Sequence, residues 1–253
     1  MLIITAIPAR YHSQRLPGKI LADISGKPLI RHVYEAVRKS KNTEKIFVVT
    51  DNAKVFKEVE SWGGACFMTD PALPSGTARI ASVVDQLDAE YIVNVQGDMP
   101  LIQPDLLDDV ILRLMEGIAD IVTPVWPIKT AQQLSDPGTV KVVRSENGNA
   151  LYFSRSPIPF VRDYKTEDWP QIHQFWGHYG IYGYQRHVLE DIAGGKLKTG
   201  KLEQAEKLEQ LSFLEAGYTI GTVETLYDEI PVDTPEELEM VRKLMAEKIK
   251  NEE

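Results

Sequence analysis

The residues best suited to chemistry lie in a short loop after the first strand-like run, LIITAIP. The loop reads ARYHSQRLPGK and carries Arg10, Arg15 and Lys19, and the first acidic residue of the chain is Asp23. The whole chain is acidic, with 37 Asp and Glu against 28 Lys and Arg. A cluster of cations in an acidic chain indicates a local anion site, although a solvated basic loop would have the same composition. A Pro-Gly turn directly before Lys19 would aim its side chain.

This loop is not one of the common phosphate-binding motifs. Ser13 stands where a Walker motif has its first glycine, and Ile20 stands where that motif has Ser or Thr after the lysine. The chain also has no GxGxxG fingerprint, which argues against a hydride-transferring dinucleotide enzyme. A nucleotide site therefore needs support from other residues.

Two aspartates provide that support. Asp98 follows the strand-like run YIVNVQ in VNVQGDMP, and Asp233 lies in VDTPEELE. A carboxylate at the carboxyl end of a strand can hold Mg²⁺ against substrate phosphates, but Asp98 could equally be an ordinary turn residue. Asp233 could merely favour a helix start; however, Thr234 with Glu237 already forms a capping box, which leaves the side chain of Asp233 free for another partner.

The stretch PSGTAR offers a third group of candidates. Ser75 precedes a helix-like segment and could simply be its N-cap. Alternatively, the hydroxyls of Ser75 and Thr77, the backbone amides and Arg79 could frame a base or a ribose.

The elements that must position these residues alternate between strand and helix. Strands are predicted at 2–8, 45–50, 65–69 and 91–96, and the segments between and after them have helical periodicity. This order predicts an α/β fold, a three-layer α/β/α sandwich with a mostly parallel, Rossmann-like sheet. Ligands bind at the carboxyl ends of strands in such sheets, which is where the cationic loop begins.

The second half of the chain breaks this rhythm. Two β-rich runs flank ENGN, a hairpin signal, and GHYGIYGY reads as one glycine-punctuated strand. We expect an exposed polar loop at 164–174, a helix over EKLEQLSFLEAG, a last strand and a last helix. The prediction is a single domain, 1–253, with a β-rich insertion around 139–185.

Bulk properties exclude several classes of protein. A net charge of −9 argues against a general nucleic-acid binder. The only cysteine, Cys66, cannot form an intramolecular disulfide, and its surroundings, GGACFMT, indicate a core strand. The apolar start is too short for a signal peptide or a membrane span, so we expect a soluble, cytoplasmic protein without membrane insertion.

Together the stretches resemble the CMP-Kdo synthetase family, the 3-deoxy-manno-octulosonate cytidylyltransferases. The resemblance runs from about residue 3 to residue 245 and rests on seven ordered blocks, IPARYHSQRLPGK, SGTAR, VQGDMP, ALYFSRSPIPF, HYGIYGY, EKLEQL and VDTPEEL. It implies a homodimeric nucleotidyltransferase that joins CTP to 3-deoxy-D-manno-octulosonate (Kdo), releases pyrophosphate and serves lipopolysaccharide biosynthesis. The β-rich insertion would contribute to the sugar site and the dimer surface.

The resemblance also implies a role for each candidate residue. Arg10 and Lys19 match triphosphate-binding residues, with Ser13 and Arg15 in the same loop, and Asp98 and Asp233 match the Mg²⁺ ligands; these two cations and two carboxylates form the catalytic set. Ser75, Thr77, Arg79 and Gln96 fall in blocks that line the nucleotide. The sugar side is implied at Gln96, Arg155, His178, Tyr182, Glu209 and Gln210. By charge, Arg155 suits the carboxylate of Kdo.

The chain departs from the family pattern at three positions. Ala78 stands where an acidic residue is usual, Met99 where Glu is common, and Ser212 where the family has arginine. None of these removes a residue named above. Relatives that use the 8-amino analogue of Kdo share the pattern, so the sequence leaves open that sugar or another acidic sugar. A silent nucleotide-binding module is disfavoured, because Arg10, Lys19, Asp98 and Asp233 are all retained.

Overall fold

The structure is a computed structural model that describes residues 2–13, 15–227 and 230–252. The chain divides into two compact units. The first comprises Met1–Asp108 and Glu229–Glu253, and the second comprises Asp109–Asp228. The β-rich segment expected at 139–185 lies within the second unit; its description as an insertion in one domain stays a prediction.

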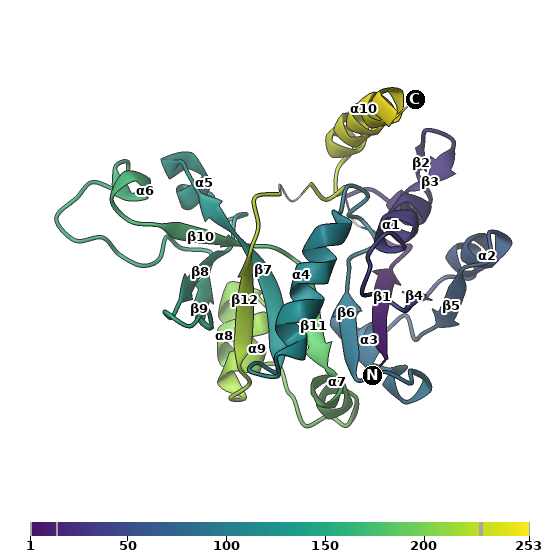
Figure 1. The fold of residues 1–253 in the computed structure, drawn as a ribbon, viewed down its shortest axis with the longest axis horizontal. Helices are drawn as coiled ribbons and strands as arrows, with labels where there is room; N and C mark the ends of the chain where they lie inside the picture. The colour runs from purple at the N-terminus through teal and green to yellow at the C-terminus, as the bar shows by residue number, and fades with distance from the viewer. Residues whose placement is uncertain (1, 14, 228–229, 253) are drawn as a thin grey trace. The chain divides into compact units, whose positions relative to one another are not determined.

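The first unit is built on a parallel sheet (Figure 1). Its strands run in the order β5-β4-β1-β6, with bounds β1 (Ile3–Ala9), β4 (Lys45–Thr50), β5 (Ala65–Met68) and β6 (Tyr91–Asn94). A small antiparallel pair is added by β2 (Asp23–Ile24) and β3 (Lys27–Pro28). The bounds of the four strands predicted from the sequence for this half are thereby confirmed to within two residues at each end. Strand β5, however, lies at the edge of the sheet and is only partly buried, so the expectation of a core strand around Cys66 is wrong.

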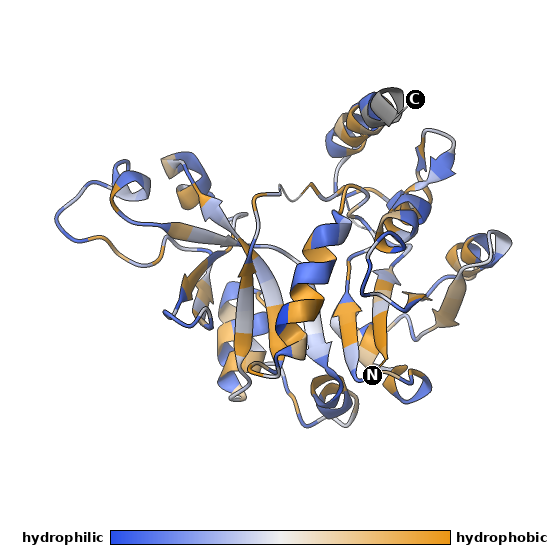
Figure 2. Ribbon diagram, viewed as in Figure 1, coloured by the Kyte–Doolittle hydropathy of each residue, from blue (hydrophilic) through white to orange (hydrophobic). Residues whose placement is uncertain are grey.

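Strand β1 is the centre of this unit. All seven of its residues are buried, and Figure 2 shows the strand mostly in the hydrophobic colour. Because alternate side chains of a strand point to opposite faces, complete burial means that both faces of the sheet are covered. Strand β1 can therefore present its carboxyl end as a rigid base for the loop that follows.

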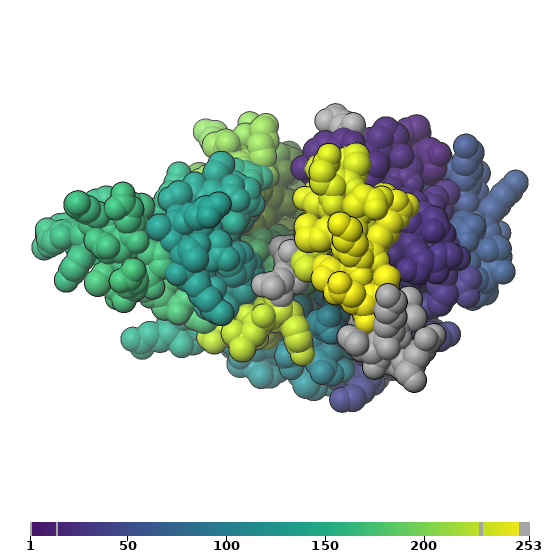
Figure 3. Space-filling view, turned by 90° about the horizontal axis from the view of Figure 1, so that it is seen from above, coloured from purple at the N-terminus to yellow at the C-terminus, as the bar shows by residue number. Residues whose placement is uncertain are grey.

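The helices of the first unit follow their strands in the predicted order. They are α1 (Leu29–Val37), α2 (Ala53–Ser61), α3 (Gly76–Ala81) and α10 (Pro235–Glu252), with short 3₁₀ turns at Lys19–Leu21 and Val84–Gln86. Helix α4 (Pro104–Met115) begins in this unit and ends in the second. Figure 3 shows α10 in yellow against the purple N-terminal residues, where Arg242 donates hydrogen bonds to the carbonyl of Asp23.

The second unit has a mixed sheet in the order β11-β7-β10-β8-β9, with β12 parallel to β7. Its strands are β7 (Ile121–Ile128), β8 (Lys141–Arg144), β9 (Ala150–Ser154), β10 (Phe175–His178), β11 (Tyr182–Gln185) and β12 (Ile220–Glu224). Its helices are α5 (Ala131–Ser135), α6 (Trp169–Ile172), α7 (Arg186–Ala193), α8 (Lys201–Glu206) and α9 (Gln210–Glu215). Strands β8 and β9 form the predicted antiparallel hairpin.

The segment GHYGIYGY was predicted as one strand, but it contributes to two strands, β10 and β11, which both pair with β7. Both pair antiparallel with β7, with His178 opposite Val125 and Gly183 opposite Val122. Between these two pairs, the four residues 179–182 lie opposite the two residues 123–124 of β7. The segment therefore bulges by two extra residues. The bulge keeps the His178 and Tyr182 rings adjacent, with centroids 5.4 Å apart.

The helix predicted over EKLEQLSFLEAG, residues 206–217, is confirmed only as α9 over Gln210–Glu215, and α8 ends where the predicted helix would begin. Helix α8 ends at Glu206, Lys207 takes a left-handed conformation with φ of 55°, and α9 starts at Gln210. The Glu206 carboxylate accepts hydrogen bonds from Ser154 Oγ at 2.6 Å and the Arg155 amide at 2.9 Å. These tertiary contacts favour ending the helix where local periodicity would continue it.

The polar stretch 164–174 was expected to be an exposed loop, and this is wrong at its centre. Trp169 is only 4% exposed and packs with Ile128, Leu134 and Phe175. Its indole Nε1 donates to the carbonyl of Tyr164 at 3.0 Å. One aromatic residue therefore anchors a segment whose average composition is polar.

No helix in the described ranges is long and apolar enough to cross a membrane.

Candidate active site

The cationic loop begins where β1 ends and folds back on itself. The Gly18 amide donates to the Tyr11 carbonyl at 3.1 Å, and Gly18 has φ of +72°. That conformation suits glycine, because a side chain there would be strained. The closed loop leads directly into the 3₁₀ turn that starts at Lys19. The Pro-Gly turn thus places Lys19 as the sequence predicted.

Lys19 lies between the two predicted carboxylates. Its Nζ is 2.6 Å from Asp98 Oδ2 and 2.7 Å from Asp233 Oδ1. Only 8% of the Lys19 side chain is exposed. Lys19 and Asp233, which are 214 positions apart in the sequence, are thereby brought into contact.

The electrostatics of this group favour a charged lysine. Burial opposes the ammonium charge, but Asp98 and Asp233 outweigh burial and raise the pKa of Lys19 above its usual value. Arg15 pairs with the other oxygen of Asp233, with Nη2 to Oδ2 at 2.6 Å, from a side chain that is 65% exposed. The exposed arginine and the buried lysine therefore share one carboxylate.

Backbone contacts explain why the two aspartates meet. The Gly97 amide donates to the Pro8 carbonyl at 3.1 Å, and a Cβ at Gly97 would lie 2.8 Å from that oxygen. Only glycine allows this close approach, which places Asp98 beside the end of β1. The Asp98 carbonyl in turn accepts the Val232 amide at 2.9 Å, which fixes Asp233 next to it.

Asp233 also has the free side chain expected from its sequence context. Thr234 Oγ1 accepts the Glu237 amide, and Glu237 Oε2 accepts the amides of Asp233 and Thr234. The capping box is thus complete without the Asp233 carboxylate, which is available to Lys19 and Arg15.

A cavity of about 410 Å³ opens over these groups. Three cations and two carboxylates line it, together with neutral side chains and backbone: Pro8, Arg10, His12, Ser13, Arg15, Lys19, Ile20, Gln96, Gly97, Asp98 and Asp233. All these residues belong to the first unit. His12 was missed as a site residue, although it stands in the same quoted loop.

The PSGTAR residues form the start of α3, as the simpler interpretation predicted. Ser75 is the N-cap, and its Oγ accepts the Ala78 amide at 3.1 Å. Thr77 Oγ1 lies 3.4 Å from Asn94 Nδ2, and Asn94 Oδ1 accepts Gln96 Nε2 at 2.9 Å. Thr77 and Gln96 are thus linked through Asn94. Arg79 is buried and contacts Asp51 and Thr69 instead.

In the second unit, His178 and Tyr182 lie together. His178 Nε2 is 3.0 Å from Thr123 Oγ1. Burial lowers the pKa of His178 to about 3, so the imidazole is neutral at physiological pH. A neutral imidazole can both donate and accept hydrogen bonds, as sugar hydroxyls require.

Arg155 holds the junction between α8 and α9. Its Nε donates to the Glu206 carbonyl at 2.8 Å, its Nη1 to the Pro137 carbonyl at 2.9 Å and its Nη2 to the Lys207 carbonyl at 3.4 Å. Glu209 and Gln210 follow this junction and begin α9. Gln210 is 3% exposed, and its Nε2 has no hydrogen-bond partner among the described residues.

The paired carboxylates suit a hard divalent cation that is shared with a substrate, rather than a cation held by protein ligands alone. Within the described ranges, no group of three or more His, Cys, Asp or Glu side chains could hold a metal by itself. Mg²⁺ characteristically takes one or two carboxylates and completes its shell with water and substrate phosphates. The donor set of Asp98 and Asp233 fits that pattern.

Comparison with known proteins agrees with this geometry. The cytidylyltransferase family model matches residues 4–224. A curated 3-deoxy-manno-octulosonate cytidylyltransferase from Thermodesulfovibrio yellowstonii is 42% identical over 253 residues, covering 97% of this chain and 98% of that protein. An 8-amino-3,8-dideoxy-manno-octulosonate cytidylyltransferase from Shewanella pealeana is 44% identical over 243 residues, covering 94% and 96%.

A solved structure extends the likeness to three dimensions. A CMP:2-keto-3-deoxy-manno-octonic acid synthetase complexed with CTP matches with a TM-score of 0.91 and 39% identity, over 98% of this chain and all of that one. The predicted α/β class is confirmed as a mixed sheet with helices on both sides. The chain belongs to the cytidylyltransferase family, among the CMP-Kdo synthetases.

Proposed function

We propose that the chain transfers the cytidylyl group of CTP to Kdo, giving CMP-Kdo and pyrophosphate. The observation that carries this proposal is Lys19 held between Asp98 and Asp233 in a cavity that Arg10 and Arg15 also line. Relatives near 40% identity carry the same activity in their names.

The reaction needs positioning and charge neutralisation more than covalent help from the protein. The anomeric hydroxyl of Kdo attacks the α-phosphorus and loses its proton to water, and the bond from that phosphorus to the oxygen that bridges it to the β-phosphorus breaks. Pyrophosphate leaves with the bonding electron pair. Arg10 and Lys19 are proposed to hold the triphosphate and to offset the charge that develops on its oxygens, with Arg15 and Ser13 beside them.

Mg²⁺ is the proposed cofactor, with Asp98 and Asp233 as its protein ligands. When bound, the cation would supply positive charge to the phosphate oxygens and lower the cost of bringing an anionic nucleotide beside two carboxylates.

The nucleotide is proposed to contact Ser75, Thr77 and Gln96 through its base and ribose. Recognition of the sugar is proposed for Gln96 and for Arg155, His178, Tyr182, Glu209 and Gln210. The unpartnered amide nitrogen of Gln210 supports this, because a buried donor requires an acceptor. The neutral imidazole of His178 also supports a sugar-binding role, because it can both donate and accept hydrogen bonds.

A second candidate differs only in the sugar. Relatives named for the 8-amino analogue of Kdo are as similar to this chain as those named for Kdo. The chemistry at the α-phosphorus is the same in both cases.

The test is release of pyrophosphate by the purified protein with Mg²⁺ and each nucleoside triphosphate, against Kdo, 8-amino-Kdo and a sialic acid. Release with CTP and Kdo supports the proposal. Release with CTP and only the amino sugar selects the second candidate. CTP binding without release for any sugar would indicate a silent nucleotide-binding module.

We also propose that the protein acts in the cytoplasm as a homodimer. Leu151, Phe160 and Ile172 are exposed apolar side chains within the β-rich segment 139–185, which is where the dimer surface was expected. Sedimentation equilibrium tests this: a monomer at micromolar concentration contradicts it.

A further inference from the structure

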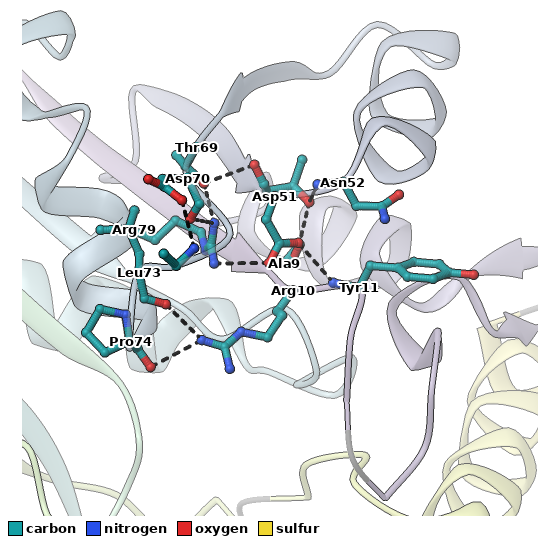
Figure 4. Close-up of polar contacts among 12 residues, drawn as sticks. Ala9, Arg10, Tyr11, Asp51, Asn52, Thr69, Asp70, Leu73, Pro74 and Arg79 are labelled. Atoms are coloured by element: carbon teal, nitrogen blue, oxygen red, sulfur yellow. Dashed lines mark hydrogen bonds and ion pairs between the residues drawn. The ribbon is translucent and has the colours of Figure 1, made fainter.

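A buried ion pair lies beside the cationic loop and was not expected from the sequence. Arg79 Nη2 is 3.2 Å from Asp51 Oδ2, and the two side chains are 1% and 5% exposed. Figure 4 shows the guanidinium of Arg79 among Asp51, Thr69 and Asp70. Its Nη1 donates to Thr69 Oγ1 and to the Asp70 carbonyl, the latter at 3.2 Å. A charge this deeply buried needs such partners.

Residues 50 and 51 hold the backbone on both sides of Arg10. Thr50 Oγ1 donates to the Ala9 carbonyl at 2.7 Å, and the Tyr11 amide donates to Asp51 Oδ1 at 3.4 Å. Asp51 thus uses one oxygen for the cationic loop and the other for Arg79. A shift of Arg79 would therefore be transmitted to the first turn of the loop.

Arg10 and Arg79 also hold the same neighbouring segment. Arg10 Nη2 donates to the carbonyls of Leu73 and Pro74 at 3.1 and 3.2 Å, while Arg79 contacts Thr69 and Asp70 (Figure 4). The segment between them leads to Ser75, which caps α3. The arrangement therefore joins the triphosphate loop to the PSGTAR segment through two arginines.

The two arginines repel each other, and Asp51 compensates. Burial lowers the pKa of Arg79, Asp51 opposes this effect, and the charge of Arg10 lowers the pKa further. Without Asp51, the buried guanidinium would face Arg10 with less opposing charge. Asp51 thus permits two like charges close to a site that is proposed to bind phosphate.

We propose that Asp51 and Arg79 are positioning residues for the nucleotide site. They fix the backbone around Arg10 and the segment before Ser75, and Arg79 acts through these contacts rather than by touching the nucleotide. The inference rests on the proposed cytidylyltransferase activity and assigns to Arg79 a role different from the direct one implied by family resemblance.

The first test compares Asp51→Asn with wild type in steady-state kinetics. Asparagine keeps the shape and can still accept the Tyr11 amide, but it removes the charge that holds Arg79. We expect the KM for CTP to rise about tenfold or more, as for loss of a hydrogen bond between charged groups, while the KM for the sugar changes less than about twofold. Equal rises in both KM values, or an unchanged KM for CTP, would overturn the proposal.

The matched control is Asp108→Asn. Asp108 is also a buried aspartate of the first unit, and it holds a turn by accepting Ser40 Oγ and the amides of Lys41 and Asn42. Its loss should lower the melting temperature without changing the KM for CTP. If Asp108→Asn raises that KM as much as Asp51→Asn does, the effect is general destabilisation and the proposal fails.

A second variant decides the matter if Asp51→Asn does not fold. Thr69→Val removes one of the two uncharged partners of Arg79 Nη1 and leaves the Asp70 carbonyl and the ion pair with Asp51 in place. It should raise the KM for CTP in the same direction but by less, about threefold to tenfold, because the guanidinium keeps its other partners. No rise would overturn the proposal.

Failure of the proposed function looks different from failure of this inference. If wild type releases no pyrophosphate with CTP and any sugar, the function is wrong. If wild type is active and the variants keep its KM for CTP, only the positioning role is wrong.

Discussion

Replacing Asp98 by asparagine separates the catalytic role of this carboxylate from its structural one. Asp98 Oδ2 lies 2.6 Å from Lys19 Nζ, and Asp233 holds the same nitrogen at 2.7 Å. Asparagine has nearly the same shape and retains an oxygen acceptor. Lys19 therefore keeps one full ion pair and one weaker hydrogen bond.

The expected cost in stability is small. Asp98 is 24% exposed, so solvent screens part of the lost attraction. Weakening a charged hydrogen bond of this kind costs about 1–2 kcal/mol, and a chain of this size loses roughly 2–4 °C in melting temperature per kcal/mol.

The expected cost in activity is much larger. If Asp98 binds the metal that offsets charge on the phosphate, its loss resembles removal of a transition-state stabilising group, about 10²–10³-fold in kcat. The protein should therefore stay folded and lose nearly all turnover. Asp105→Asn is a matched control, because the Asp105 side chain is 70% exposed and its ion pair with Lys41 is loose, with Oδ1 3.9 Å from Lys41 Nζ. This variant should change neither the melting temperature nor kcat.

The assay is Mg²⁺-dependent pyrophosphate release with CTP and Kdo at saturating concentrations, with thermal unfolding followed by circular dichroism. Turnover of Asp98→Asn within about tenfold of wild type would refute the metal role, since the effect would be no larger than that of one ordinary hydrogen bond. A large fall in melting temperature with proportionate loss of activity would show that Asp98 is mainly structural.

Three further outcomes follow from individual side chains. Burial lowers the pKa of His178 from 6.5 to about 3. Between these two pH values only the unfolded chain binds a proton at this residue, so the free energy of unfolding decreases as the pH falls below about 6.5, by about 3 kcal/mol at pH 4. Urea unfolding measures this, and an equal pH slope in His178→Asn would contradict it. Burial, with a smaller effect of Glu60, raises the pKa of Cys66 to about 12, so the native thiol should react with a maleimide at pH 8 at least about tenfold more slowly than in denaturant; rapid native labelling would contradict it. Arg155→Leu removes the hydrogen bonds that the guanidinium donates to the carbonyls of Glu206, Lys207 and Pro137. The KM for the sugar should therefore rise about tenfold while the KM for CTP stays unchanged. An unchanged KM for the sugar would contradict this prediction.

The sequence predicted those features that depend on local chemistry. Continuous apolar runs indicated β1 and β4, and the capping box at Thr234 indicated both the start of α10 and the free carboxylate of Asp233. The cationic loop was recognised because its composition contrasts with an acidic chain. These signals are all contained within a few consecutive residues.

Features created by tertiary contacts were not predictable in this way. The break after Glu206 depends on Ser154 and Arg155, which are about fifty positions away. The Asp51–Arg79 pair depends on β4 and α3 meeting, and nothing near Asp51 in the sequence marks it as buried. Trp169 could have been suspected from its size alone, since a tryptophan in a polar stretch usually finds an apolar neighbour.

The three departures from the family pattern are accommodated locally. Ala78 contributes a backbone amide to the Ser75 cap, Met99 is buried, and Ser212 accepts the Gly200 amide at 2.7 Å and donates to Glu203. None of these side chains is among the residues that line the cavity over Lys19. Their replacement therefore bears on packing and on the α8–α9 region rather than on the triphosphate groups.

The charges of the site explain why a cationic loop and two carboxylates must occur together. Lys19 and Arg15 are paired with Asp98 and Asp233, so their positive charge is largely neutralised within the protein. A triphosphate can use these cations fully only if the carboxylates find another positive partner. A divalent cation is such a partner, since it binds the carboxylates and the phosphates at once. Nucleotide and metal should therefore strengthen each other's binding, and by linkage each must do so to the same extent. The loop needs no acid of its own because Asp98 and Asp233 reach it from beyond β6 and from the start of α10.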